Sequence, residues 1–560
     1  MTVVGPGRGP LDEAGQAVSA VGAAPLRGIS TVDGMRRLNV RLVAGLLVLL
    51  LAAAACGDDA GTAPAAGVEE PPGPDLAAAR ALPALGGQPA VEGRGRGRIV
   101  DADGREVVLR GVNVNALAEY WSGNEFDTVF PLTDDDIARM EAIGWNAVRL
   151  LVSWSRVEPE PGEYDEAYLN EVDDAVDRLA ARGLYTIVDL HQDAWGATLA
   201  ARDDEGCASG TQPAIGWDGA PGWATRGGDE PGTRCTIDGS RETSAAVLAS
   251  FDAFWNDAPG PDGTGIRTRY AAMIGHLAAR WADRPEIAGY DVMNEPNAYG
   301  DTGTAGLTDL YAEAIAAVRE AEEAADGAFG HLVLVEPSII WSGTGEGRPA
   351  DLPDDPDLVY APHLYEGGFD GSEITEDAFA DAHADAAALG GLPVLSGEWG
   401  ADPRRAGPDG DGYFVEHQRL QDQTGTSATL WTWRESCGDP HKIGEDDPYV
   451  WGEFDVDCTT NEVLGPRDDL IADLTRARVQ AAPGRLDTTG WDSAAGLFEV
   501  SGSGAETGAT LVAFVPDRLR EATLEVSGLT EPTVVPIPDG GAYLLADTTA
   551  ADWSLTVTSG

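Results

Sequence analysis

The sequence predicts a (β/α)8 barrel followed by a small antiparallel β-sandwich, and three patterns indicate this fold class. Eight short apolar runs between residues 107 and 433 are typical of buried strands. Amphipathic helical segments separate several of them, as in a parallel sheet with helical crossovers. After about Pro483 the runs become short, alternating and divided by Gly, Asp and Pro, which favours a sandwich. A chain of 560 residues is long enough for both parts.

The first 56 residues are typical of an export signal. A basic segment, Met35-Arg36-Arg37, is followed at 42–51 by an apolar stretch too short to span a bilayer. Small residues directly before Cys56 resemble a bacterial lipoprotein signal, in which this Cys is lipidated and becomes the mature N-terminus. Residues 1–34 lack this pattern, so we expect translation to start at Met35. An ordinary secretory peptide is the alternative, and both predict an exported protein.

The remaining boundaries follow from composition and periodicity. Residues 57–95, rich in Ala, Gly and Pro, are predicted to be a flexible linker. The barrel is expected over 96–482, beginning with a hairpin at 99–109 that turns at Asp103-Gly104. Thr133 and Gly144 are the expected caps of one helix, and Gly183 ends the next. The expected barrel strands are 107–112, 147–152, 185–190, 287–293, 332–335, 358–362, 393–395 and 428–433.

The sandwich is expected over residues 483–560. Its predicted strands are 497–501, 509–515, 522–526, 533–537, 543–545 and 553–557.

Charge and cysteine content restrict the partners and the compartment. A formal net charge of -57 repels phosphate backbones, which argues against nucleic acid as a partner. In an oxidising compartment the four cysteines after Cys56 favour disulfides, with local pairing Cys207–Cys235 and Cys437–Cys458. Zinc binding is the alternative, but neither pair has the short ligand spacing of a structural zinc site.

Two glutamates carry the predicted chemistry. Met293-Asn294-Glu295-Pro296 and Ser396-Gly397-Glu398-Trp399-Gly400 each place a Glu at the end of a predicted strand. Two carboxylates at the ends of different parallel strands suit a glycosidase that retains anomeric configuration, with a separation of about 5–5.5 Å. We expect Glu398 to be the nucleophile and Glu295 the general acid/base, with a raised pKa.

Further polar and aromatic residues at the strand ends are candidates for substrate binding. Arg149 and Tyr365 are expected to orient Glu398 and keep it ionised, and Asn294 to donate to the sugar 2-hydroxyl. Each of the remaining candidates has a purely structural alternative. They are His191 and Asp193 as hydrogen-bonding partners of the sugar, His363 as an orienting group for either Glu, and Trp431 as a stacking floor.

The insertion at residues 196–245 contains Trp217 and Trp223, which either form a lipid-facing rim or pack within the loop. No metal cluster or phosphate-binding loop is evident, and this chemistry needs no cofactor.

This ordered set resembles glycoside hydrolase family 5, and more narrowly its endoglycoceramidase branch. The pattern is an Arg on strand two, a His after strand three, Asn-Glu-Pro after strand four, His-x-Tyr after strand six, then Glu and Trp. These are Arg149, His191, Asn294-Glu295-Pro296, His363-Leu364-Tyr365, Glu398 and Trp431. The resemblance implies cleavage of the β-glycosidic bond between an intact glycan and ceramide.

One segment departs from the endoglycoceramidase pattern. Enzymes of that branch that process long glycans have basic residues just after strand one, whereas residues 113–121 here contain no Lys. This argues against sialylated or long glycans, and an enzyme acting on galactosyl- or glucosylceramide, or on another β-glycoside with a lipid aglycone, fits the sequence as well. The alternatives are another family 5 activity, such as an endo-β-1,4-glucanase or mannanase, or an inactive sugar-binding lipoprotein.

Overall fold

The computed structural model describes residues 74–560 apart from 92–94, 238, 370, 402–411, 443–449, 539 and 560. The predicted leader at 1–56, with Cys56, and the first part of the predicted linker lie outside the described residues. Among the helices that are described, none combines the length and apolar character needed to cross a membrane.

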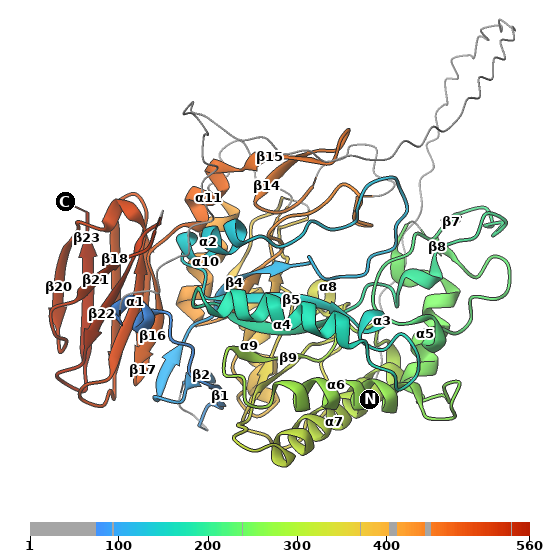
Figure 1. Cartoon of the computed structure of the whole chain (residues 1–560), viewed down its shortest axis with the longest axis horizontal. Helices are drawn as coiled ribbons and strands as arrows, with labels where there is room; N and C mark the ends of the chain where they lie inside the picture. The colour runs from blue at the N-terminus through green and yellow to red at the C-terminus, as the bar shows by residue number, and fades with distance from the viewer. Residues whose placement is uncertain are drawn as a thin grey trace, which may run out of the picture. The chain divides into compact units, whose positions relative to one another are not determined.

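Eight parallel strands form the central barrel (Figure 1), in the order β11-β10-β9-β6-β5-β4-β13-β12. A parallel bridge between Tyr360 and Val394 joins the two ends of this order and closes the barrel. The predicted fold class is confirmed, and each predicted strand overlaps one in the structure. The strands are β4 (Arg110–Val114), β5 (Ala147–Ser153), β6 (Tyr185–His191), β9 (Ile287–Asp291), β10 (Leu332–Val335), β11 (Leu358–Tyr360), β12 (Leu395–Trp399) and β13 (Ser427–Leu430).

Helices surround the barrel, and α2 begins at the capping residue that the sequence predicts. Thr133 forms a capping box with Asp136 at the start of α2, and Gly144 ends this helix at φ 90°. The helices of the barrel are α2 (Asp134–Ile143), α3 (Trp154–Val157), α4 (Glu166–Ala180), α5 (Ala245–Trp255), α6 (Ile266–Trp281), α7 (Gly300–Ala324), α8 (Trp341–Thr344), α9 (Glu376–Ala388) and α10 (Tyr413–Thr424), followed by α11 (Asp468–Leu474).

Alternation along the barrel strands carries charged residues inward at their carboxyl ends. On β6, Tyr185 and Ile187 belong to the apolar core at the amino end of the barrel. Side chains two residues apart share a face of a strand, so Asp189 and His191 continue the same inward row. On β5, Ala147 and Arg149 are related in the same way. The barrel interior is thus apolar at one end and ionic at the other.

The sandwich contains strands from both ends of the chain. Its larger sheet has the order β1-β2-β3-β16-β19-β22-β21 and its smaller sheet β17-β18-β23-β20. The strands before the barrel are β1 (Leu85–Gln88), β2 (Arg98–Asp101) and β3 (Arg105–Val107). Those after it are β16 (Arg478–Pro483), β17 (Arg485–Asp492), β18 (Leu497–Ser503), β19 (Thr510–Val515), β20 (Thr523–Ser527), β21 (Thr533–Pro536), β22 (Ala542–Asp547) and β23 (Trp553–Thr558).

The linker prediction at 57–95 is wrong for its second part, which forms α1 (Pro74–Ala79) and β1. Small residues serve close packing here. A Cβ at Gly87 would lie 2.1 Å from the carbonyl oxygen of Pro356, and the Gly87 N–H donates to Asp357 Oδ1 at 2.8 Å. The composition that suggests flexibility therefore lets the backbone of β1 lie directly against the barrel.

The larger sheet lies between the barrel and the smaller sheet, and β19 shows how one strand serves both sides. Leu511, Ala513 and Val515 belong to the core between the two sheets. Val512 and Phe514 belong to the core shared with the amino ends of the barrel strands. Because side chains alternate along a strand, β19 is buried on both faces and joins the two domains.

Two disulfides hold the loops above the barrel. The bonds Cys207–Cys235 and Cys437–Cys458 match the predicted local pairing. The first closes most of the 196–245 insertion, whose short elements are β7 (Thr211–Pro213) and β8 (Cys235–Ile237). The second closes a loop that contains β14 (Phe454–Asp457). This strand pairs with β15 (Glu462–Pro466).

A buried carboxylate joins the barrel, α1 and the sandwich. Glu141 on α2 accepts from Arg80 at 2.6 and 2.7 Å and from the Tyr543 hydroxyl of β22 at 3.3 Å. We predict that Glu141→Gln lowers the free energy of unfolding by about 3 kcal/mol, because it leaves the Arg80 guanidinium without a full counter-charge.

Urea unfolding followed by tryptophan fluorescence measures this loss. Arg178→Gln, at the exposed pair with Asp134, is the control and should cost less than about 1 kcal/mol. Equal losses in the two variants would contradict a special role for Glu141.

Candidate active site

A cavity of about 320 Å³ opens at the carboxyl ends of the barrel strands. Seven of the nine residues predicted for the site line it: His191, Asp193, Asn294, Glu295, Tyr365, Glu398 and Trp431. The other two, Arg149 and His363, lie behind the two glutamates and contact them. Six further residues line the cavity, namely Arg241, Phe369, Glu435, His441, Lys442 and Trp451.

Arg149 is fully buried and organises the carboxylates at the centre. Its Nη1 donates to Glu398 Oε1 at 3.0 Å, and Nη2 donates to Asn294 Oδ1 at 2.9 Å. The same guanidinium lies 3.0 Å from an oxygen of Asp189, Asp291 and Glu336. Burial alone would lower the pKa of Arg149, but these anions outweigh it and raise the pKa well above its ordinary value.

The two glutamates lie close together at the ends of two parallel strands. Glu398 is on β12 and Glu295 follows β9, and one carboxylate oxygen of each lies within 4.8 Å of the other. An inverting pair is spaced at about 6.5–9.5 Å to leave room for water. The Tyr365 hydroxyl donates to Glu398 Oε2 at 2.8 Å. Arg149 and Tyr365 therefore both contact Glu398, as the sequence predicts.

The Glu295 backbone adopts an unusual conformation that is held from both sides. Its φ is 40°, in the left-handed region that non-glycine residues rarely occupy. The Glu295 N–H donates to Glu336 Oε2 at 2.8 Å, and Gln192 Nε2 donates to the Glu295 carbonyl at 3.0 Å. These contacts fix the direction in which the Glu295 carboxylate enters the cavity.

His363 lies between three carboxylates. Its Nδ1 is 3.0 Å from Glu295 Oε1 and 3.5 Å from Glu398 Oε2, and its Nε2 is 3.2 Å from Glu336 Oε1. Burial alone would lower the pKa of His363, but Glu336 and Glu398 outweigh it and raise the pKa well above 6.5. His363 is thus an imidazolium that orients both glutamates, which is one of the predicted alternatives.

The pKa of each glutamate in the unliganded protein differs from the expected direction. Burial favours the neutral form of Glu295, but the hydrogen bond from His363 and the charges of His363 and Arg241 outweigh it and lower the pKa. Burial raises the pKa of Glu398, against the charges of His363 and Arg149. Glu295 therefore starts as a carboxylate, and substrate binding must change its surroundings before it can act as an acid.

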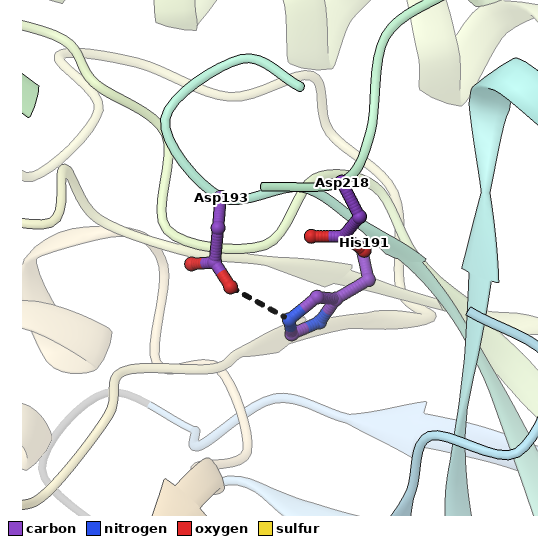
Figure 2. A group of neighbouring side chains, drawn as sticks. All are labelled: His191, Asp193 and Asp218. Carbon is purple, nitrogen blue, oxygen red and sulfur yellow. Dashed lines mark ion pairs between the residues drawn. The ribbon is translucent and has the colours of Figure 1, made fainter. Parts of the chain in front are cut away.

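His191 and Asp193 line the cavity, and Figure 2 shows them converging with the buried Asp218. His191 Nδ1 lies 2.7 Å from Asp189 Oδ2, and Nε2 lies 3.6 Å from Asp193 Oδ2. Although burial opposes it, Asp189 raises the pKa of His191 well above 6.5, whereas burial raises the pKa of Asp218 to about 7.

Trp431 lines the cavity beside His191, whereas the two tryptophans of the insertion are not among its lining residues. The Trp431 ring is stacked on His191 at 5.6 Å between centroids and an interplanar angle of 13°. Trp217 is buried against His441, and Trp223 donates to the Glu158 carbonyl at 3.0 Å while packing on Trp154. Loop packing, rather than a lipid-facing rim, therefore describes both tryptophans of the insertion.

Several charged residues of the site are not among the predicted ones. Asp291 and Glu336 stand at the ends of β9 and β10, so the strand-end argument that identifies Glu295 could have found them. Arg241, Glu435, His441 and Lys442 come from long connections, where periodicity gives no signal. Lys442, the single lysine of the sequence, lies 3.5 Å from Glu435 Oε2.

A family model for cellulase (glycosyl hydrolase family 5) matches residues 100–436. The chain belongs to glycoside hydrolase family 5. The crystal structure of an endogalactoceramidase is 34% identical, with a TM-score of 0.73, and the match covers 86% of this chain and 100% of that one. Endo-glycoceramidase II from Rhodococcus sp., as a lactosyl-enzyme intermediate, is 24% identical and shares the fold, with a TM-score of 0.62 over 82% of this chain and 99% of that one.

Among characterised sequences, endoglycoceramidase I of Rhodococcus hoagii (strain 103S) is 29% identical over 285 residues, which make up 48% of this chain. The match spans about half, 51%, of that relative. These comparisons confirm the family and the branch that the motif order indicates, and the roles of individual residues remain predictions.

We predict that Glu336→Gln lowers the pKa of His363, because it removes the anion that contributes most to raising it. His363 then loses its charge at a lower pH than in the wild type. In the variant, the Glu295 N–H and Arg149 also compete for the single oxygen of the Gln side chain. We therefore expect kcat/KM to fall about tenfold or more.

NMR titration of the histidine side chains measures the first effect, and a pH profile of kcat/KM the second. Glu313→Gln, at the surface pair with Arg267, removes the same charge far from the cavity and should leave both unchanged. An unshifted His363 titration in the Glu336 variant would show that Glu336 does not control this proton.

Proposed function

We propose that this protein is a retaining endo-β-glycosidase that hydrolyses the bond between an intact glycan and ceramide in glycosphingolipids. The observation that carries the proposal is the pair Glu295 and Glu398, with oxygens within 4.8 Å at the ends of two parallel strands. The similarity to endogalactoceramidase over the whole of that chain supports the lipid substrate.

In the first step Glu398 attacks the anomeric carbon and forms a covalent glycosyl-enzyme. Glu295, after taking up a proton, donates it to the glycosidic oxygen as the bond to carbon breaks, and ceramide leaves with a free hydroxyl. Arg149 and Tyr365 each donate to one oxygen of Glu398. These hydrogen bonds orient the carboxylate before it attacks, as its negative charge is lost on forming the ester.

In the second step Glu295 is a carboxylate and takes a proton from water. The water oxygen bonds to the anomeric carbon, the bond to Glu398 breaks, and the glycan is released with retained configuration. Both steps, as proposed, use only these side chains and water.

The walls of the cavity suit a short neutral glycan. Asn294, His191 and Asp193 present polar groups to a sugar bound over Glu398, and Trp431 offers an apolar face for its ring. Of the described residues that line the cavity, Lys442 faces Glu435 and Arg241 faces Asp193 and Glu295. Tyr365, Phe369 and Trp451 add aromatic surface at the opening, suited to a lipid aglycone.

We predict that the purified protein releases free ceramide and an intact glycan from galactosyl-, glucosyl- or lactosylceramide, and less from a sialylated ganglioside. Thin-layer chromatography of both products measures this, with cellulose and mannan oligomers as alternative substrates. Glu295→Gln and Glu398→Gln are the matched controls, and each should lose at least about 10²-fold in kcat.

Cleavage of the oligomers with no ceramide released would move the protein to the polysaccharide hydrolases of family 5. Ceramide release that survives in the Glu398 variant would exclude the nucleophile assigned here. A protein that binds glycan in both variants and in the wild type without turnover would be the inactive sugar-binding alternative.

We further propose that the protein is exported and attached to a membrane surface through a lipid on Cys56. The supporting pattern is the basic segment, the short apolar stretch and the small residues before Cys56. We predict that Cys56→Ser abolishes incorporation of labelled palmitate and moves the protein from the membrane fraction to the medium. Labelled lipid in the Ser variant, or an unmodified wild type, would contradict the anchor, and Cys437→Ser is the control for loss of a cysteine.

A further inference from the structure

Arg241 extends from the 196–245 insertion into the catalytic centre. It begins the short helix η3 (Arg241–Thr243), soon after the strand that carries Cys235. Its Nη1 lies 2.7 Å from Asp193 Oδ1, and its Nη2 donates to Glu295 Oε2 at 2.8 Å. The guanidinium also lies over the Trp217 ring, 4.7 Å from the centroid. One cation thus connects the carboxylate predicted to bind sugar with the acid/base.

Both oxygens of Glu295 are engaged in this arrangement. Oε1 lies 3.0 Å from His363 Nδ1, and Oε2 accepts from Arg241. A guanidinium has only donors and stays charged, so its contact with Oε2 favours the ionised form of Glu295. A proton on Oε2 is therefore disfavoured while Arg241 contacts that oxygen.

We propose that Arg241 is a positioning residue that holds Glu295 as an aligned carboxylate for the deglycosylation step and releases Oε2 for the glycosylation step. The proposal rests on the retaining mechanism of the proposed function, but not on the lipid nature of the substrate. In the first step Arg241 gives up Oε2, which takes a proton from solution and passes it to the glycosidic oxygen. In the second step the restored contact aligns the carboxylate that accepts a proton from water.

Arg241 keeps negatively charged partners after it releases Glu295. Its Nε lies 2.5 Å from Glu242 Oε1, and Nη1 keeps its contact with Asp193. Two of three carboxylate partners therefore remain when the third leaves, so exchange of Oε2 does not strand a buried cation.

All charged groups that face Glu295 enter its titration. His363 comes from the segment after β11, Arg241 from the insertion and Asp193 from the segment after β6. Glu336 accepts from the Glu295 N–H, and the Glu398 carboxylate and the Tyr299 phenol are the other neighbours. The two cations outweigh the anions and burial, and lower the pKa of Glu295.

Arg241→Gln and Arg241→Lys test the proposal on aryl β-glycosides. A dinitrophenyl leaving group needs no proton, so turnover of this substrate reports deglycosylation, and we expect Arg241→Gln to lower its kcat about tenfold. A poor leaving group reports Glu295 as an acid. Without the guanidinium Glu295 keeps its proton to higher pH, so the alkaline limb of kcat/KM should rise by about one unit. Arg241→Lys keeps the charge and should return the limb toward the wild-type position.

Arg202→Gln, in the same insertion at the pair with Glu205, is the control and should behave as the wild type. Equal losses with both leaving groups and an unshifted alkaline limb in Arg241→Gln would overturn the proposal and leave a structural role alone. If the protein turned over aryl glycosides but released no ceramide from glycosphingolipids, the proposed lipid substrate would be wrong. The role of Arg241 could still be tested on the aryl glycosides.

A measurement on the wild-type protein keeps the proposal open to refutation if Arg241→Gln does not fold. The enzyme is trapped as a 2-fluoroglycosyl intermediate, and its reactivation is followed against pH. A lowered pKa keeps Glu295 in the base form at lower pH, so the rate should fall only below the ordinary glutamate value of about 4.3. A midpoint clearly above that value would overturn the proposal.

Discussion

The buried guanidinium of Arg149 is the interaction on which the catalytic end of the barrel depends. A carboxylate removed from water is destabilised by several kcal/mol unless it is paired, and four of them meet inside this barrel. One cation from β5 contacts all four, from Asp189, Asp291, Glu336 and Glu398. The ends of β6, β9, β10 and β12 are held in register around it. Four carboxylates around one guanidinium leave an excess of negative charge. Burial and the charge of Glu336 accordingly raise the pKa of Asp291 well above its ordinary value.

The excess negative charge around Arg149 is balanced from outside the barrel strands. His363 supplies one positive charge between Glu295 and Glu398, and Arg241 supplies another from the insertion. The barrel strands therefore set where the two glutamates stand, whereas His363 and Arg241, which lie outside the strands, lower the pKa of Glu295. Related enzymes with the same strands but another insertion could run the same chemistry at a different pH, because the catalytic geometry and the acidity of Glu295 have separate sources.

Strand patterns predicted the barrel and most of the site because both follow from local sequence. Apolar runs mark the strands, and polar residues at their ends, such as Asn294 and Tyr365, converge in any closed parallel sheet. Packing between distant segments could not be predicted in this way. Whether an Ala- and Gly-rich segment packs closely, as at Gly87, depends on the residues opposite it and not on its own sequence. Arg241 stands in a loop whose path depends on a disulfide and on Trp217, and the pKa of Glu295 depends on Arg241 in turn.

The larger sheet of the sandwich takes β3, which ends at Val107, and pairs it with β16, which begins at Arg478. The whole barrel lies in sequence between these two partners. During synthesis on the ribosome, the edge of β3 must stay unpaired until the last part of the chain emerges, with its apolar residues exposed. Assembly of the joint between the domains is therefore a late event. A chain shortened at its C-terminus would leave an adhesive strand at its N-terminus, which makes such fragments prone to aggregation.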